Sequence, residues 1–317
     1  MSERFDLARL RTVHLVPLTA YDSAGQIDAE LQAAHTARMA QAGISTYLPA
    51  AGTSEFHSLS ADEVVELVRI TRQAAGEDAA IFAPVGLQVG HAIEIATRSL
   101  DAGATGIMFM PFSHPYMSDE GAKGYYQAVM KAAPCPTLIY KKAPIPANSL
   151  LLELADHPYV VGVKYAFNNM EEFRRTVLKD SKQGSPKIEW LCGSAERFAP
   201  YYMLAGSTGY TTGAGNLCPH ITLAMHAAFV AGEFAEGMRL QELLLPIEEY
   251  RARAGDSYNI SMLKGAMKVL DQDFGPPRPP QRQLTPSEQA EIEAMIRPLL
   301  AIEAEMKAEF ESAGLAG

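Results

Sequence analysis

Residues 160 to 166 read VVGVKYA, a short apolar stretch with one lysine, Lys164, near its end. Val160, Val161 and Val163 are β-branched, and such a run predicts a strand that is buried on both faces. The ammonium of Lys164 has two alternatives: it reaches solvent at the strand tip, or it points into a pocket. In a dry pocket the pKa of a lysine falls, and the neutral amine can attack a ketone to form a Schiff base.

The composition is that of a globular protein with a large core. The chain has 317 residues, of which 48% are hydrophobic and 20% are charged. Its 27 Lys and Arg residues are outnumbered by 37 Asp and Glu residues, and this net charge of -10 disfavours nucleic acids and anionic membranes as partners. No apolar run approaches the roughly 20 residues of a transmembrane helix, and the N-terminus is too polar for a secretory signal, so we expect a cytoplasmic protein.

The cysteine and histidine patterns argue against a metal or a disulfide framework. Cys135, Cys192 and Cys218 are odd in number, lie far apart and form no C-x-x-C pair. No H-E-x-x-H segment or clustered His, Asp and Glu spacing occurs. We therefore expect chemistry that needs no metal and no other cofactor.

Short apolar runs of β-forming residues recur along the chain, 21 to 35 residues apart, beginning at Val13, Thr46, Ile81, Gly106, Pro136, Val160, Ile188 and Gly209. Helical periodicity separates them, over 28–41, from Ser60 onward, and over 91–101, 119–132, 169–180 and 196–205. Ser60 and Glu63 form a capping-box signature. Eight strand and helix alternations over roughly 250 residues predict a (β/α)8 TIM barrel. The alternative is an open doubly wound sheet, but its nucleotide-binding motifs G-x-G-x-x-G and G-x-x-x-x-G-K are missing.

Beyond Gly215 only helical periodicity remains, over residues 221–231, 234–252, 257–271 and 286–313. The stretch GPPRPPQRQ, residues 275–283, predicts an extended connector. Pro298 is expected to kink the last helix or to end it early. We therefore expect a catalytic barrel over residues 1–233 and a C-terminal helical region over residues 234–317.

Chemistry in a (β/α)8 barrel takes place where the strands end and the following loops begin. The second predicted strand is followed by AAGTSEF, residues 50–56, where Thr53 and Ser54 offer hydroxyl and N–H groups to a carboxylate. The fifth strand ends in Tyr140 and the sixth in Lys164. A phenol beside an amine, with a carboxylate site opposite, is what imine chemistry on a 2-keto acid requires. This combination favours the pocket for Lys164 over the solvent.

Three further strand ends carry polar or small residues. Lys141 and Lys142 follow the tyrosine of the fifth strand, and we expect both to be solvated, with one of them able to meet a distal substrate carboxylate. The seventh strand ends in Cys192-Gly193-Ser194, and the eighth in Tyr210-Thr211-Thr212-Gly213.

These motifs resemble those of the dihydrodipicolinate synthase and N-acetylneuraminate lyase superfamily of Schiff-base lyases, over residues 10 to about 300. GTSEF stands where the superfamily has Gly-Thr-x-Gly-Glu, and VGVK where it has the imine lysine. Tyr140 matches its strand 5 tyrosine, and PPRPP near residue 278 also matches. The resemblance implies Lys164 as the imine former, Tyr140 as the proton shuttle, and Thr53 with Ser54 as the carboxylate site. It also implies Gly193 and Thr211 as substrate contacts, and a homo-oligomer that is a dimer or a tetramer.

The sequence differs from the dihydrodipicolinate synthase motifs at several positions, and these differences indicate which branch of the superfamily it resembles. The paired tyrosines of dihydrodipicolinate synthases align with Phe112 and Ser113, and their arginine for the aldehyde's carboxylate aligns with Ile145. Ser54 replaces the motif's second glycine. A dihydrodipicolinate synthase is therefore disfavoured.

The chain is more similar to the 5-dehydro-4-deoxyglucarate dehydratase branch. The similarity rests on Glu55-Phe56 followed by Ser58-Leu59, and on SYNISMLKGAM at residues 257–267. In that branch a cation follows the strand 5 tyrosine, and Lys142 stands at that place. The resemblance thus implies an acidic 2-keto-3-deoxy sugar as substrate, and Lys142 as a substrate contact.

The sequence as a whole predicts a Schiff-base lyase that acts on a 2-keto acid. Dehydration of a 2-keto-3-deoxy sugar acid is the first interpretation. A pyruvate-dependent aldolase or a condensing enzyme is the second, because both reactions share one enamine. A non-catalytic keto-acid sensor is the alternative from another class, supported by the departure at Phe112 and Ser113.

Overall fold

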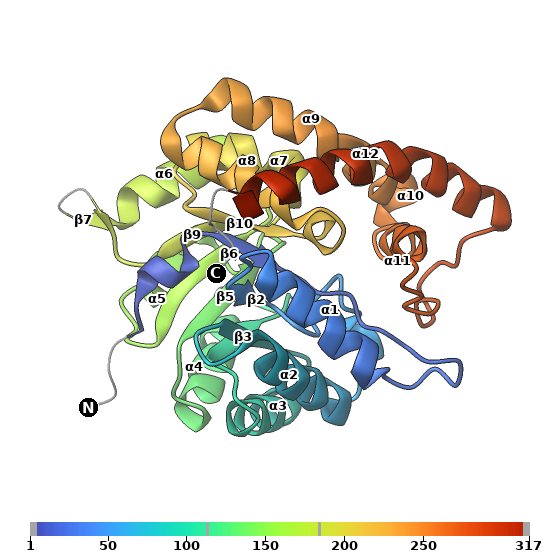
Figure 1. The fold of residues 1–317 in the computed structure, drawn as a ribbon. Coiled ribbons are helices and arrows are strands. Elements are labelled where there is room, and N and C mark those ends of the chain that lie inside the picture. The colour runs from blue at the N-terminus through green and yellow to red at the C-terminus, as the bar shows by residue number, and fades with distance from the viewer. Residues whose placement is uncertain (1–4, 112–113, 183–184, 313–317) are drawn as a thin grey trace.

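The computed structural model describes residues 5–111, 114–182 and 185–312, and its centre is a closed barrel of eight parallel strands (Figure 1). The first strand pairs with both the second and the last, so the barrel sheet has no free edge. The barrel strands are β1 (Val13–Leu15), β2 (Thr46–Tyr47), β3 (Ala80–Val85), β4 (Gly106–Phe109), β5 (Thr137–Lys141), β6 (Val160–Tyr165), β9 (Glu189–Cys192) and β10 (Gly209–Thr212). The predicted (β/α)8 barrel is confirmed, and the doubly wound sheet is excluded.

A helix follows each barrel strand and covers the outside of the sheet (Figure 1). These helices are α1 (Ala29–Gln41), α2 (Ala61–Ala75), α3 (Val89–Asp101), α4 (Asp119–Ala132), α5 (Asn148–Leu154), α6 (Met170–Asp180), α7 (Ala195–Leu204) and α8 (Pro219–Ala231). The predicted capping box is present, since Ser60 accepts from the Glu63 N–H and Glu63 from the Ser60 N–H. The sequence did not predict α5, because its seven residues are too few to show a helical period.

Short elements fill the connections between the main ones. A small antiparallel pair, β7 (Ser181–Lys182) and β8 (Ser185–Pro186), lies outside the barrel between α6 and β9. The 3-10 segments of the described residues are η1 (Leu7–Leu10), η2 (Phe56–Ser58), η3 (Ala214–Asn216) and η4 (Lys268–Leu270). Of these, η2 directly follows the β2 loop and η3 directly follows β10, so both lie at the carboxyl ends of strands.

The C-terminal helices are α9 (Phe234–Arg251), α10 (Arg253–Asp256), α11 (Ser261–Met267) and α12 (Pro286–Ser312). Of these, α9 and α12 pack against the barrel helix α8, and α10 and α11 pack against α9 (Figure 1). Glu303 of α12 accepts from the N–H groups of His220 and Ile221, at 3.0 and 3.1 Å, in the first turn of α8. A carboxylate stabilises a helix N-terminus because it satisfies free N–H groups there. The helical extension is therefore fixed to the barrel by specific polar contacts.

Two expectations about the C-terminal region have different outcomes. Residues 272–285 contain no helix or strand, which confirms the predicted connector at 275–283. Pro298 does not end the last helix, which runs on to Ser312. Ile292, Ile296 and Leu299 are buried along α12, and this packing offsets the hydrogen bond that the proline cannot make.

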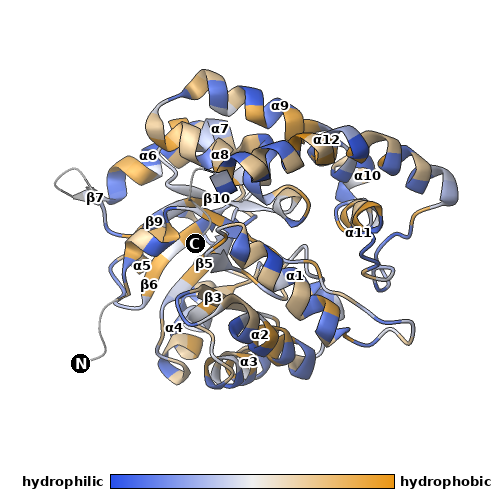
Figure 2. Cartoon of the chain, viewed as in Figure 1, coloured by the Kyte–Doolittle hydropathy of each residue, from blue (hydrophilic) through white to orange (hydrophobic). Residues whose placement is uncertain are grey.

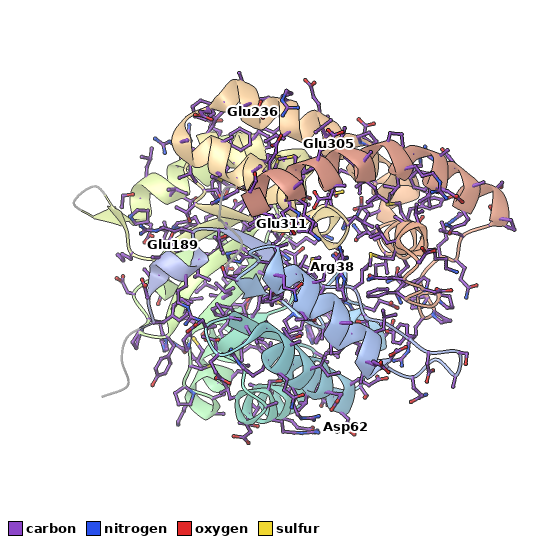
Figure 3. All side chains as sticks on the ribbon, viewed as in Figure 1. Arg38, Asp62, Glu189, Glu236, Glu305 and Glu311 are labelled. Carbon is purple, nitrogen blue, oxygen red and sulfur yellow. The ribbon has the colours of Figure 1, made fainter. Side chains whose placement is uncertain are left out.

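Apolar residues gather on the strands and on the inner faces of the helices (Figure 2). The acidic side chains of Asp62, Glu305 and Glu311 lie on the outside of the molecule (Figure 3). No helix within the described ranges is both long and apolar enough to cross a membrane. All six residues of β6 are buried, as its β-branched sequence predicts.

Candidate active site

Lys164 is the fifth of the six residues of β6, and it is buried, with 4% of its surface exposed. Of the two predicted alternatives, the structure therefore has the lysine in the interior. Burial lowers its pKa to about 7, because a charged amine loses its solvation there. The positive charge of Lys142 and, more weakly, that of Arg251 act in the same direction, whereas Cys192 opposes them. About half of the Lys164 amine is consequently neutral near pH 7.

Tyr140 lies directly beside this lysine. The two residues are partners in the β5–β6 register, and the Lys164 Nζ is 4.1 Å from the centroid of the Tyr140 ring. Burial raises the pKa of Tyr140 to about 12, with contributions from Cys192 and Asp256. Its hydroxyl is therefore protonated at neutral pH and can donate a proton or a hydrogen bond close to the amine.

Gly193 and Thr211 approach the lysine from the next two strands. A Cβ atom on Gly193 would lie 2.8 Å from the Lys164 Cγ and 3.0 Å from the Ala166 Cβ, so only glycine fits there. Its N–H donates to the Tyr165 carbonyl at 2.7 Å and is therefore engaged within the protein. Thr211 is 4% exposed, and its hydroxyl makes a long contact of 3.4 Å to the Cys192 carbonyl.

The β2 loop places Thr53 and Ser54 in different environments. The Ser54 hydroxyl donates to the Pro17 carbonyl, and its N–H donates to the Ala51 carbonyl at 3.1 Å. Both Ser54 donors therefore hold the loop in place. Thr53 is half-buried, and its hydroxyl lies at 3.4–3.5 Å from polar side chains of the C-terminal region.

The backbone of this loop is strained at both of its ends. Ala50 has φ 55° and Glu55 has φ 70°, values in the left-handed region that disfavour residues with a side chain. Such residues cost about 1–3 kcal/mol each and collect at functional sites, where surrounding contacts maintain them. The loop that holds Thr53 is therefore shaped by contacts outside itself.

The two lysines after Tyr140 differ, and the expectation that both are solvated is wrong for one of them. Lys141 is 2% exposed, and its Nζ donates to the carbonyls of Ala143 at 2.9 Å and Pro146 at 2.7 Å. It therefore braces the loop behind the strand. Lys142 is exposed, and its charge is near enough to lower the pKa of Lys164.

Sequence reasoning missed Arg251 and Asn259, which reach the β2 loop from the C-terminal region. The Arg251 Nη2 donates to Asn259 Oδ1 at 2.9 Å and lies 3.4 Å from the Thr53 hydroxyl. A signal was present: Leu244, Ile247 and Arg251 share the buried face of α9, and an arginine on an apolar face needs partners.

The acidic residue of GTSEF, Glu55, makes a buried ion pair with Lys264 of α11. The two side chains are 0% and 2% exposed, and the carboxylate oxygen is 2.8 Å from the Lys264 Nζ. The backbone N–H of Arg278 donates to the other carboxylate oxygen of Glu55 at 2.7 Å. Tyr21 stacks against both cations, with the Lys264 Nζ 4.0 Å and the Arg278 Cζ 4.3 Å from its ring centroid. This cluster fixes the β2 loop to the C-terminal region.

Replacing Lys264 by methionine is expected to destabilise the protein by about 3–5 kcal/mol, because it leaves the Glu55 carboxylate buried without its partner. The matched control is Lys268→Met, which removes an exposed pair with Asp273 and should cost at most about 1 kcal/mol. Urea unfolding of both variants measures the difference. Equal midpoints for the two variants would show that the buried pair does not anchor the loop.

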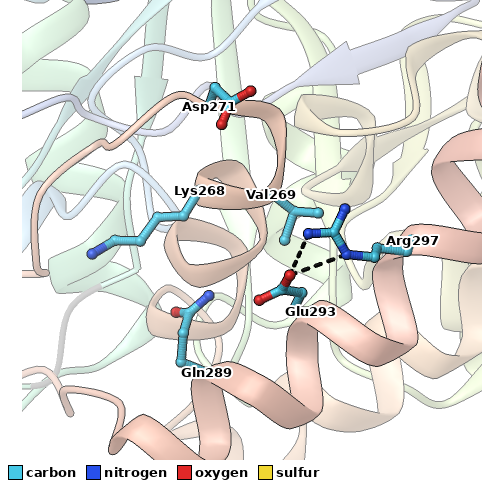
Figure 4. Close-up of a pocket in the computed structure, with 6 residues that line it drawn as sticks. All are labelled: Lys268, Val269, Asp271, Gln289, Glu293 and Arg297. Carbon is cyan, nitrogen blue, oxygen red and sulfur yellow. Dashed lines mark hydrogen bonds and ion pairs between the residues drawn. The ribbon is translucent and has the colours of Figure 1, made fainter.

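A pocket of about 230 Å³ lies elsewhere, between η4 and α12 (Figure 4). It is lined by Lys268, Val269, Asp271, Gln289, Glu293 and Arg297. Glu293 pairs with Arg297 one helical turn away on the surface of α12. None of these residues contacts Lys164 or Tyr140, so this pocket is separate from the strand-end cluster.

The remaining expectations from the sequence concern the positions that differ from the dihydrodipicolinate synthases and the ligands for a metal ion. Phe112 and Ser113, which align with the paired tyrosines, lie outside the described residues. Ile145, in place of the arginine, is half-buried. Within the part of the chain that the structure describes, no three His, Cys, Asp or Glu side chains are grouped to hold a metal ion.

Comparison with known proteins identifies the family. The sequence model of the dihydrodipicolinate synthetase family matches residues 9–299. The chain belongs to this family. Membership makes it a class I lyase, one that works through a lysine Schiff base, and a keto acid is the substrate class of the family. The resemblance inferred from the strand-end motifs is thereby confirmed.

Relatives in the dihydrodipicolinate synthetase family are similar over most of their length. The chain is 30% identical, over 288 residues, to a probable 5-dehydro-4-deoxyglucarate dehydratase of Azotobacter vinelandii, with 89% of this chain and 93% of the relative covered. It is 28% identical, over 289 residues, to the 5-dehydro-4-deoxyglucarate dehydratase of Pseudomonas putida, with 89% and 93% covered. The crystal structure of dihydrodipicolinate synthase from Bacillus clausii is 30% identical and superposes with a TM-score of 0.87, covering 92% of this chain and 98% of that one.

Proposed function

We propose that this protein dehydrates a 2-keto-3-deoxy sugar acid through an imine on Lys164. The observation that carries the proposal is the buried amine of Lys164, with its pKa lowered to about 7, 4.1 Å from the ring of Tyr140. The branch is supported by relatives that are 5-dehydro-4-deoxyglucarate dehydratases. Lys142 after β5 and Ile145 in place of an arginine also support it.

The proposed reaction begins with attack of the neutral Lys164 amine on the C2 ketone. The carbinolamine loses water and becomes a protonated imine, which acidifies the C3 hydrogens. Loss of a C3 proton gives the enamine, and the enamine expels the C4 hydroxyl as water once that oxygen is protonated. Hydrolysis of the imine then releases the product and restores the amine. The hydroxyl of Tyr140 donates and accepts these protons.

The proposed carboxylate subsite is the β2 loop. Thr53 offers its hydroxyl to the C1 carboxylate. Ser54 keeps the loop in shape, because its hydroxyl donates to the Pro17 carbonyl and its N–H to the Ala51 carbonyl. Ser54 can contact the carboxylate only when one of these two hydrogen bonds breaks. Gly193 lets the Lys164 side chain lie against the backbone after β9, and Thr211 offers a hydroxyl that makes a long contact of 3.4 Å to the Cys192 carbonyl.

Condensation or cleavage of a carbon–carbon bond is the second candidate, because it uses the same enamine. It is favoured by the similarity to the synthase of Bacillus clausii, which is 30% identical. Against it stands Ile145, whose side chain cannot bind the carboxylate of an aldehyde substrate by a charge-assisted bond.

A direct test compares purified protein on two substrate sets. We expect 2-keto-3-deoxy sugar acids to be consumed much faster than pyruvate plus aspartate semialdehyde. Loss of an arginine contact to a carboxylate typically costs about 1.5–3 kcal/mol, roughly ten- to a hundredfold in affinity. Efficient condensation of pyruvate with the semialdehyde would assign the protein to the synthases instead. No turnover of either set, despite binding of a keto acid, would indicate a sensor.

Lys142 provides a second prediction about the substrate. Lys142→Met should raise KM for a diacid sugar by up to about fivefold more than KM for the matching monoacid, because an exposed ion pair is worth about 0.2–1 kcal/mol, whereas loss of the positive charge near Lys164 acts on both substrates alike. Steady-state kinetics on both substrates measure the ratio, and the monoacid is the internal control. An equal change for both substrates would show that Lys142 does not meet the distal carboxylate.

A further inference from the structure

Arg251 and Asn259 connect the C-terminal region to the β2 loop through a small polar triangle. The Arg251 Nη2 donates to Asn259 Oδ1 at 2.9 Å and lies 3.4 Å from the Thr53 Oγ1, which lies 3.5 Å from the same Asn259 oxygen. We propose that Arg251 and Asn259 are positioning residues that hold the Thr53 Oγ1 in place, so that its hydroxyl proton turns from the long 3.5 Å contact with Asn259 Oδ1 to the substrate carboxylate. This inference rests on the proposed function, in which Thr53 contacts that carboxylate.

The guanidinium of Arg251 is itself held from several sides. Its Nε donates to the Asn259 carbonyl at 3.1 Å, and its Nη1 pairs with Glu248 one turn earlier on α9. The side chains of Arg251 and Glu248 are each 6% exposed. Because most of its N–H donors are engaged, Arg251 orients other groups and does not swing toward a substrate. A lysine cannot make these forked contacts at once.

Gly213, the residue after β10, accommodates this arrangement. A Cβ atom there would lie 2.7 Å from the Arg251 Cζ and 2.6 Å from its Nη1, closer than van der Waals contact permits. The guanidinium therefore lies against the backbone at the end of β10. One side chain of α9 thus touches the loop after β2 and the backbone after β10.

The charge of Arg251 also acts on Lys164. It lowers the pKa of the amine in the same direction as burial. Glu248 pairs with Arg251 and partly neutralises this charge. Burial, and after it the neighbouring Glu248 carboxylate, raises the pKa of the Glu196 carboxyl. Among the described residues, the titratable and charged groups that act on or contact Lys164 include Lys142, Tyr140, Cys192, Arg251 and, from β1, His14.

The test measures imine formation with pyruvate, trapped by borohydride, as a function of pyruvate concentration and pH. Asn259→Ala should raise the half-saturating pyruvate concentration about three- to tenfold, the equivalent of one neutral hydrogen bond. The maximal trapping rate and the pH midpoint should stay unchanged, since no charge is altered. Arg251→Lys should behave in the same way. The matched control is Arg253→Lys, two residues further along in α10, which alters an exposed pair with Glu291 of α12 and should change neither quantity.

Two more variants separate positioning from a general loss of structure. If Asn259 acts through the Thr53 hydroxyl, Asn259→Ala should have little further effect in a Thr53→Val background. Arg251→Met should move the pH midpoint upward by about 0.5 to 1 unit, because it removes a positive charge near the amine.

The outcomes are distinct for the inference and for the proposed function. If the wild-type protein forms no adduct, the proposed function fails, and the inference fails with it. If wild type forms the adduct but Asn259→Ala has the wild-type half-saturation, or its effect adds fully to that of Thr53→Val, only the inference is overturned. Asn259 carries no charge and is half-buried, so this variant decides the question even if Arg251→Lys does not fold.

Discussion

Lys164→Met is expected to lower turnover by roughly 10⁴-fold or more, because covalent catalysis through the imine would supply a large part of an enzymatic acceleration that is at least about 10⁶-fold. Methionine is also unbranched and keeps most of the length of the side chain and of its packing in the buried site. The fold should therefore persist while the reaction stops. Steady-state kinetics on a 2-keto-3-deoxy sugar acid measure the loss.

The same variant should be more stable than the wild type. The folded-state pKa of Lys164, about 7, lies below the value of about 10.4 for a free lysine. At any pH below about 10, folding therefore has to remove the proton of this amine or bury its charge, and either costs free energy of folding. Removing the amine abolishes this cost, and we expect a gain of about 1–2 kcal/mol in the free energy of unfolding at pH 7.

The control for both effects is Lys131→Met, on the exposed surface of α4, which should leave turnover and stability unchanged. Loss of activity in Lys164→Met together with a loss of stability would mean that Lys164 is a structural residue. Activity close to that of the wild type would exclude the imine.

Tyr140→Phe has the second largest expected effect. The variant should lower turnover by about 10²–10⁴-fold, the usual contribution of general acid–base catalysis, while most of the trapped adduct still forms. The ring that lies 4.1 Å from the Lys164 Nζ is kept, and only the hydroxyl is removed. Comparing kcat with the yield of borohydride adduct separates proton transfer from imine formation.

Tyr165→Phe is the matched control for the phenol. Its hydroxyl is buried one residue after Lys164 but contacts Asn148, on the outer side of the barrel, so turnover should stay within a few-fold of the wild type. If Tyr140→Phe turned over at the wild-type rate, the proton shuttle would have to be sought at other groups, such as Tyr116 or His114.

The barrel was predictable because each of its buried parallel strands is a short apolar run. The number of these runs and their spacing along the chain can be read directly from the sequence. The pairing of Tyr140 with Lys164 also follows from strand ends, since the carboxyl ends of parallel strands share one rim. Local signals with a fixed period were therefore sufficient to predict the fold and the pairing of Tyr140 with Lys164.

The errors concern the direction of side chains and distant contacts. Lys141 and Lys142 are adjacent, yet side chains in a strand alternate, so Lys141 points behind the sheet toward carbonyl groups. Counting from Tyr140, the alternation places Lys142 on the same face as Tyr140 and Lys141 on the opposite face, so the sequence could have distinguished the two lysines. The contact of Arg251 with Thr53 spans 198 residues, and no local pattern encodes which buried partner an arginine will find. The donors of Ser54 are engaged for a similar reason, because Pro17 comes from another strand end.

Reductive trapping tests the central claim most directly. The wild-type protein is incubated with pyruvate and borohydride, digested, and its peptides are weighed by mass spectrometry. We expect one reduced adduct per chain, on the peptide that carries Lys164, forming faster as the pH rises through about 7, where the amine becomes neutral. An adduct on another lysine, or no adduct with any 2-keto acid tried, would contradict the assignment of Lys164 as the imine former.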